Sequence, residues 1–181
     1  MANKYLKNFF AIVLGWSLVI FQLGFINGLP HWLGEMNLIV VILIFILSIK
    51  GEKTVLWWSV LTGVLLDIFS FTPFGFNVIN LSLIVIFSYF LLERFFTNRS
   101  LYSFLALILF ASCCYRLLEA GVVYLIGFIS SNELIFYLDK DFWFRQAGGV
   151  GVDLIITVII FYLLSLFSHA LKPMFLLKRN R

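Results

Sequence analysis

The amino-acid sequence predicts an all-α integral membrane protein with six transmembrane helices, short loops and both termini in the cytoplasm. Three observations predict this fold: the apolar composition, the number of long apolar runs and the distribution of basic residues between them. Of the 181 residues, 62% are hydrophobic and only 12% are charged. A soluble domain of this length has too little interior to bury so much apolar surface. The bilayer is therefore expected to solvate most of the chain.

Six apolar runs divide the chain, which we interpret as a single polytopic membrane domain over residues 1–181. A transmembrane helix needs about 20 residues. The first run follows two lysines, as in a signal peptide, but has no clear small-x-small cleavage site, so we expect it to be retained. The second run is short for a span, and the fifth is long and is expected to tilt. The expected spans are Asn8–Asn27, Met36–Ile49, Thr54–Phe71, Gly75–Leu92, Leu101–Ile129 and Gly148–Ser168.

Basic residues between the runs predict the orientation, because cytoplasmic loops are enriched in lysine and arginine. With six spans, Lys140 and Arg145 fall on one side and Arg116 lies within a span. All others fall on the opposite side, which we assign to the cytoplasm. These are Lys4, Lys7, Lys50, Lys53, Arg94, Arg99, Lys172, Lys178, Arg179 and Arg181. The net charge of +4 is accordingly attributed to topology and anionic lipid, with no nucleic acid expected as a partner.

Charged side chains within a span are costly and usually face the bundle interior or a cavity. Four are expected here: Asp67, Arg116, Glu119 and Asp153. At a rise of about 1.5 Å per residue, all four fall in the outer half of the membrane. Four polar residues are expected in the same layer, and two of them share a helix face. They are Asn77 and Asn80, which share the face, together with Gln22 and Asn27.

This polar layer has two interpretations. Its members can satisfy one another and fix the helix register, because lipid offers no hydrogen bonds. They can instead line a substrate pocket that opens to the outside. The residues alone favour the first interpretation. Within it, Arg116 needs an acidic partner, and the candidates are Glu119 on the same helix face, Asp67 and Asp153.

Small residues mark sites where helices are expected to pack closely. The first span has two such pairs, Ala11 with Gly15 and Gly24 with Gly28. The glycines at the start of the sixth span are expected to provide close packing or a hinge. The adjacent Cys113 and Cys114 are expected to pack in the core. The outer segment Ser130–Ala147 has spacing typical of an amphipathic helix lying on the membrane surface.

Motifs for catalysis or cofactor binding are missing from the sequence. It contains no HExxH motif, no phosphate-binding loop and no cysteine or histidine spacing typical of a metal site. We therefore expect no enzymatic activity, no catalytic residue, no metal and no cofactor.

The segment from Gly63 to Asn77 resembles the bacterial rod shape-determining protein MreD. The residues that carry the resemblance are Gly63, Asp67, Pro73 and Gly75, which form a glycine, an aspartate and a short turn between two apolar helices. The wider resemblance covers residues 30–125. It implies a non-catalytic plasma-membrane subunit of the cell-elongation machinery, which supports peptidoglycan synthesis and cell shape. The implied partners are MreC-like and other elongation-complex proteins.

A different class of protein fits the same topology. Substrate-binding S components of energy-coupling-factor vitamin transporters also have six helices, cytoplasmic termini and a binding site in the outer half of the membrane. Ala11 and Gly15 would match the small residues that S components use to contact their coupling subunit. The turn from Asp67 to Gly75 favours MreD.

The orientation can be tested by labelling single cysteines in intact cells with an impermeant thiol reagent. Cysteines at Asn98 and Asn180 should be shielded, because the basic residues place both positions in the cytoplasm. A cysteine at Asn132 should react. Labelling at Asn180 without labelling at Asn132 would reverse the predicted orientation.

Overall fold

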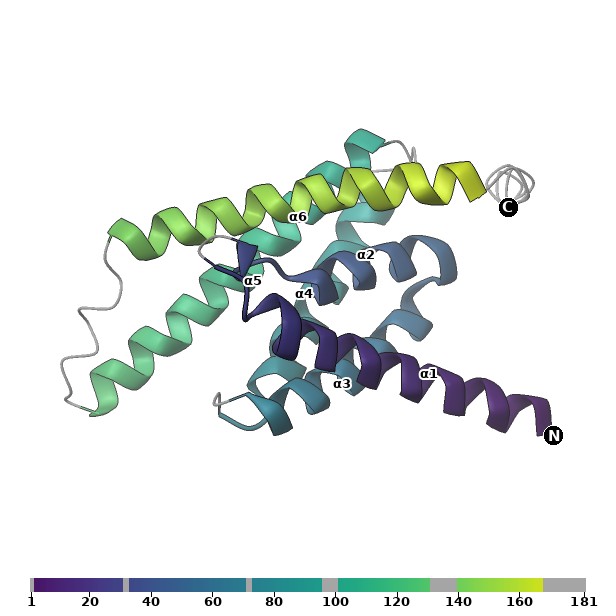
Figure 1. The fold of residues 1–181 in the computed structure, drawn as a ribbon, viewed down its shortest axis with the longest axis horizontal. Coiled ribbons are helices and arrows are strands. Elements are labelled where there is room, and N and C mark those ends of the chain that lie inside the picture. The colour runs from purple at the N-terminus through teal and green to yellow at the C-terminus, as the bar shows by residue number, and fades with distance from the viewer. Residues whose placement is uncertain (1, 31–32, 71–72, 96–100, 131–139, 168–181) are drawn as a thin grey trace.

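The described part of the chain is helical throughout. The computed structural model describes residues 2–30, 33–70, 73–95, 101–130 and 140–167, and these ranges contain no strand. Figure 1 shows the arrangement of the helices. The elements are α1 (Ala2–Phe21), the π-helix η1 (Gln22–Ile26), α2 (Leu38–Lys50), α3 (Glu52–Phe69), α4 (Phe76–Arg94), α5 (Leu101–Ser130) and α6 (Lys140–Phe167).

The helices run back and forth between two ends of the molecule. The start of α1, the junction of α2 with α3 and the end of α6 lie toward one end, at the right of Figure 1. The turn between α3 and α4 and the start of α6 lie toward the other end. Three segments are long and apolar enough to cross a membrane: Phe76–Arg94, Leu101–Val122 and Lys140–Leu164. The apolar helices Ile12–Ile26 and Leu38–Lys50 are shorter, so the six-span topology stays a prediction.

The largest difference from the sequence prediction is the start of the last helix. We expected a surface helix within Ser130–Ala147 and a separate span from Gly148. Instead, α6 begins at Lys140 and continues through that boundary, and residues 131–139 lie outside the described ranges. The polar character of Lys140–Ala147 misled the prediction, because these residues form the first two turns of a continuous helix.

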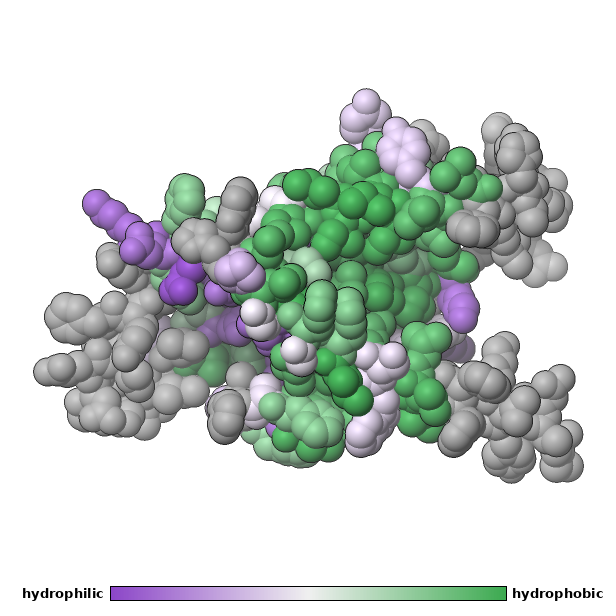
Figure 2. Space-filling model, viewed as in Figure 1, coloured by the Kyte–Doolittle hydropathy of each residue, from purple (hydrophilic) through white to green (hydrophobic). Residues whose placement is uncertain are grey.

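The apolar side chains divide into an interior core and a lipid-like exterior. The core is formed mainly by α2, α3, α4 and α5, with fully buried residues such as Ile44, Val55, Leu81 and Ile108. Large apolar side chains are also exposed on every α-helix, and they cover much of the middle of the molecule in Figure 2. Such a surface suits a hydrocarbon solvent. Contrary to expectation, Cys113 belongs to this exterior, since it is exposed on α5.

Two glycines mark the closest approaches between helices. A Cβ atom on Gly63 would lie 2.6 Å from the Cα atom of Val78, so α3 and α4 pack backbone against backbone there. A Cβ atom on Gly15 would overlap the side chain of Leu61 on α3. The other pair in α1 behaves differently. Gly24 has nothing within 4 Å of its Cβ position, and Gly28 approaches only the backbone of its own segment. The side chain of Ala11 lies outside the described set.

Candidate functional site

Asp67, near the end of α3, caps the start of the next helix. Its carboxylate accepts hydrogen bonds from the backbone N–H groups of Gly75 at 2.9 Å, Asn77 at 2.9 Å and Val78 at 3.4 Å. The first N–H groups of a helix have no partner within the helix, and they form a partial positive charge. A carboxylate from the preceding helix therefore satisfies and neutralises the start of α4.

The conformation of the turn between α3 and α4 explains why the residues that carry the family resemblance occur at these positions. Gly75 is the residue before α4 and has a φ of +92°, a conformation that favours glycine. The carbonyl of Pro73 accepts the N–H of Phe76 at 3.1 Å. Every backbone N–H from Gly75 to Ile79 thus has a partner, because Ile79 donates to the Gly75 carbonyl at 3.0 Å. These five N–H groups therefore need no water as a partner.

Asn77 links this cap to α5. Its side-chain amide donates to Asp67 at 2.9 Å and to the hydroxyl of Ser70 at 3.2 Å. The Tyr115 hydroxyl donates to the side-chain oxygen Oδ1 of Asn77 at 3.2 Å. Three helices, α3, α4 and α5, are thereby joined through one buried asparagine. Asn80, expected in the same layer, is buried, but neither polar atom of its amide has a partner among the described residues.

The start of α2 is capped by the same device. The N–H of Asn37 donates to Asp153 Oδ1 on α6 at 2.8 Å, and the N–H of Leu38 donates to Gln22 Oε1 at 3.1 Å. The Asn37 side chain accepts from Val40 at 3.1 Å. A carboxylate and an amide from two other helices therefore satisfy a helix start that local residues cap only in part.

Arg116 on α5 lies against this second cap. Its guanidinium pairs with Asp153 Oδ2 at 2.8 Å, and both side chains are buried. It also donates to the Glu35 carbonyl at 2.9 Å and to Gln146 Oε1 at 2.8 Å. A Cβ atom on Gly149 would lie 2.7 Å from the guanidinium. Gly149 of α6 therefore packs closely against Arg116. The sequence had left a hinge as the alternative role for the glycines in this part of the helix.

Of the three acids considered as partners for Arg116, Asp153 makes the ion pair. Among the described residues, Glu119 forms no ion pair or hydrogen bond with Arg116, although it lies one turn further along α5. The carboxylate of Asp67 is hydrogen-bonded to the start of α4. The sequence left all three acids open as partners, because spacing gives distances only along one helix, whereas the pairing depends on how α5 and α6 cross.

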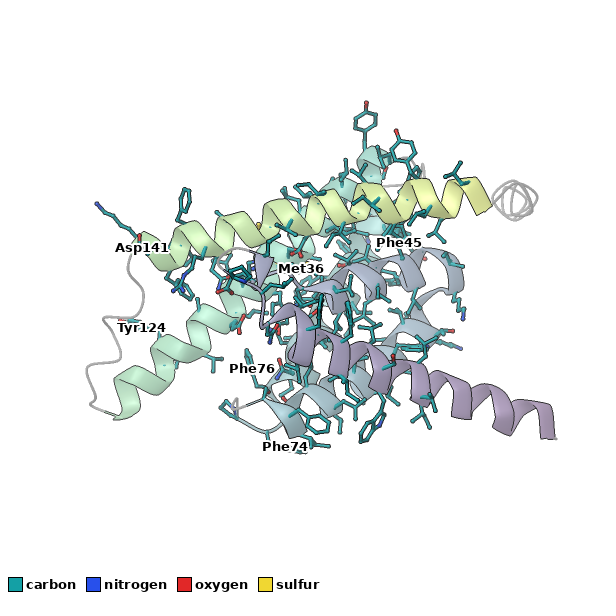
Figure 3. The ribbon with its side chains drawn as sticks, in the orientation of Figure 1. Met36, Phe45, Phe74, Phe76, Tyr124 and Asp141 are labelled. Atoms are coloured by element: carbon teal, nitrogen blue, oxygen red, sulfur yellow. The ribbon has the colours of Figure 1, made fainter. Side chains whose placement is uncertain are left out.

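A π-helical turn brings two further polar residues to the second cap. The N–H of Asn27 donates to the carbonyl of Gln22, five residues earlier, at 3.0 Å. The Gln22 side chain donates to the Met36 carbonyl at 2.8 Å and to Asn27 Oδ1 at 3.3 Å. Figure 3 shows Met36 in the segment that precedes α2, near the middle of the molecule. π-Helical turns often occur at functional sites, and this one aims Gln22 at the start of α2.

Both capped helix starts border one cavity of about 460 Å³. The first cap contributes Ser70, Asn77 and Tyr115, and the second contributes Gln22, Asn37 and Arg116. In Figure 2 hydrophilic residues gather toward the end where α6 begins, in contrast to the apolar middle. The two interpretations of the polar layer are thus compatible in geometry. Four of its eight members, namely Gln22, Asn27, Asn77 and Arg116, bond to another member and also line the cavity. The remaining lining residues are Leu23, Asn27, Leu29, Gly34, Glu35, Met36, Ile39, Leu66, Glu119, Arg145 and Gln146.

Four residues of this site were not expected from the sequence. Asn37 precedes an apolar run, so the rule for helix N-caps would have identified it. Tyr115 is adjacent to Arg116 in sequence, but nothing in the sequence indicates that it reaches α4. Glu35 lies in a connection, and Gln146 lies in the segment interpreted as a surface helix. Their roles depend on the arrangement of the helices.

The Arg116–Asp153 pair should contribute to stability through mutual neutralisation. Breaking a buried pair from one side typically costs about 3–5 kcal/mol, because the remaining charge is left buried. Arg116→Ala should therefore lower the melting temperature in detergent much more than Arg94→Ala, a change at the exposed end of α4. Arg116→Lys should rescue only part of the loss, since lysine lacks the planar fork that reaches several acceptors.

A double-mutant cycle separates the pair from other effects of the substitution. The double variant Arg116→Met/Asp153→Leu should lose less stability than the sum of the two single losses, because it leaves neither charge buried without its partner. Strictly additive losses in melting temperature would contradict a direct interaction between the two side chains.

The chain was compared with known protein families and proteins. The family model for the rod shape-determining protein MreD matches residues 4–145. The match contains the Asp67 cap and the turn at Gly75, and it ends before Asp153. No match was found among curated proteins or among solved structures. A family model that spans this much of the chain, including its most distinctive turn, identifies the chain as a member of the MreD family.

Proposed function

We propose that this protein is a non-catalytic plasma-membrane subunit of the bacterial cell-elongation complex and supports peptidoglycan synthesis and cell shape. The observation that carries this proposal is the family match over residues 4–145. It includes α1 through α5 and the whole Asp67 cap, so the best-defined local structure of the chain falls within the matched region.

The bonding of Asp67 and Asp153 supports a structural role for these two side chains. Both carboxylate oxygens of Asp67 accept backbone N–H groups at the start of α4. One oxygen of Asp153 accepts the Asn37 N–H, and the other pairs with Arg116. These two carboxylates hold helices together, as expected in a scaffold.

The proposed partners are MreC-like and other proteins of the elongation complex, together with the lipid bilayer. The exposed apolar side chains of α1 and α4, such as Trp16, Ile20, Ile79 and Phe87, suit contact with lipid or with the transmembrane helix of a partner. The fixed helix starts support the role of a scaffold, because a bundle whose helices are tied by internal caps presents a defined surface to a neighbour.

The alternative function, a substrate-binding S component of a vitamin transporter, is distinguishable by experiment. Its support is limited to the cavity at the polar end of the bundle. The family match favours cell shape. An S component retains its vitamin tightly, whereas a scaffold subunit has no need of one.

Depletion of the protein in its rod-shaped host should give round, swollen cells, and expression of the wild-type gene should restore rods. The variant Asp67→Leu should restore them poorly, because the start of α4 would lose its anion. Asp141→Asn, which changes an exposed acid at the start of α6, is the matched control and should restore rods fully. Microscopy and immunoblotting would give cell shape and protein level.

Two outcomes would contradict the proposed function. One is normal rod shape and growth after complete depletion. The other is a stoichiometric vitamin that accompanies the protein through purification, which would support the S component.

A further inference from the structure

The cavity beside the two helix caps is lined by charged groups that have spare hydrogen-bonding capacity among the described residues. The guanidinium of Arg145 and the carboxylate of Glu119 both line it. Within the described residues, neither group takes part in a hydrogen bond or an ion pair that the structure records. Glu35, a third charged lining residue, accepts a single bond on its carboxylate, from Gln146 at 3.2 Å. In contrast, both carboxylate oxygens of Asp67 and of Asp153 in the neighbouring caps are hydrogen-bonded.

The cavity lining contains charges of both signs. Glu119 and Glu35 each contribute a carboxylate to it. The guanidinium of Arg116, which also lines the cavity, is already bonded to Asp153, to the Glu35 carbonyl and to Gln146. Arg145 is the other cation in the lining, and it comes from the second turn of α6. The lining therefore offers an acidic subsite at the two glutamates and a basic subsite at Arg145.

The size and the lining of the cavity restrict the ligand further. A volume of about 460 Å³ lies within the range of about 300–1,000 Å³ that is usual for small-molecule sites. Among the described residues, no three side chains of His, Cys, Asp or Glu are grouped so as to hold a metal ion. Leu23, Leu29 and Met36 supply apolar surface beside the charged groups. An organic molecule with a charged part of each sign fits this lining.

We propose that the cavity binds a zwitterionic ligand that carries a primary ammonium group and a carboxylate or phosphate. The ammonium group donates to Glu119 and Glu35, since an ammonium has three donors and a carboxylate only accepts. The anionic group pairs with Arg145 as a charge-assisted hydrogen bond. The ligand is either the headgroup of an aminophospholipid or a free small zwitterion. The proposal does not depend on the role in cell shape.

Native mass spectrometry of the delipidated full-length protein tests the lipid source. The probes are phosphatidylethanolamine, phosphatidylcholine and phosphatidylglycerol, titrated separately. Calorimetry with phosphoethanolamine and glycylglycine tests the free source. We expect one-to-one binding of phosphatidylethanolamine or of a free zwitterion. Phosphatidylcholine should bind more weakly, because its methylated nitrogen has no N–H donor, and phosphatidylglycerol should bind more weakly because it has no cation.

Two variants test the subsites. Glu119→Gln and Arg145→Gln should each weaken binding of the preferred zwitterion by about tenfold, the loss expected for one charge-assisted hydrogen bond. The matched controls are Asp141→Asn and Arg94→Gln, which change exposed charges outside the cavity, and both should bind as the wild type does. Melting temperatures verify that all four variants are folded.

Several results would overturn the proposal. One is binding of phosphatidylglycerol as tight as that of phosphatidylethanolamine, which would leave no role for the ammonium group. Another is wild-type affinity in both Glu119→Gln and Arg145→Gln, which would assign the bound molecules to the general lipid surface. The last is the absence of binding for all of the lipids and free zwitterions.

Discussion

The starts of two helices, α2 and α4, impose the constraint on which this structure depends. Helix starts expose N–H groups that hydrocarbon cannot satisfy, so a protein in a bilayer must supply the acceptors itself. Here the acceptors come from other helices: Asp67 of α3 caps α4, and Asp153 of α6 caps α2. Each cap satisfies backbone N–H groups at a helix start and also joins two different helices. Two carboxylates thereby fix how four helices are placed.

The two caps explain the roles of the other residues around them. Asp153 is a buried anion, and Arg116 neutralises it from α5. Gly149 leaves room for the guanidinium, and the π-helical turn η1 directs Gln22 to a second N–H of the α2 start. Gly63 allows the backbones of α3 and α4 to meet, which brings Asp67 within reach of its partners. The cavity lies beside these caps, where the helices diverge. The same arrangement of helices positions the charged residues that line it.

Much of the fold follows from hydropathy, because an apolar run of sufficient length has no stable alternative to a helix in a bilayer. The ends of α2, α3, α4 and α5 fall within two residues of the predicted spans. Hydropathy does not specify how helices cross, and this is why the sequence could not choose among Glu119, Asp67 and Asp153 as the partner for Arg116. It also fails where polar residues begin a long helix, as at Lys140–Ala147. The residues Asp67, Asn77 and Gly75 were identified because the turn is local, whereas Glu35, Tyr115 and Gln146 join the site only through tertiary structure.

Amide hydrogen exchange at the start of α4 tests most directly whether a carboxylate from another helix caps it. The experiment compares the wild type with Asp67→Ala in detergent by NMR, at the amides of Gly75, Asn77 and Val78. These amides should exchange about tenfold faster in the variant, the loss expected for one hydrogen bond to a charged group. Amides at Ile84 and Val85, in the middle of α4, should keep their rates. Unchanged exchange at Gly75, Asn77 and Val78 would mean that the start of α4 does not depend on Asp67.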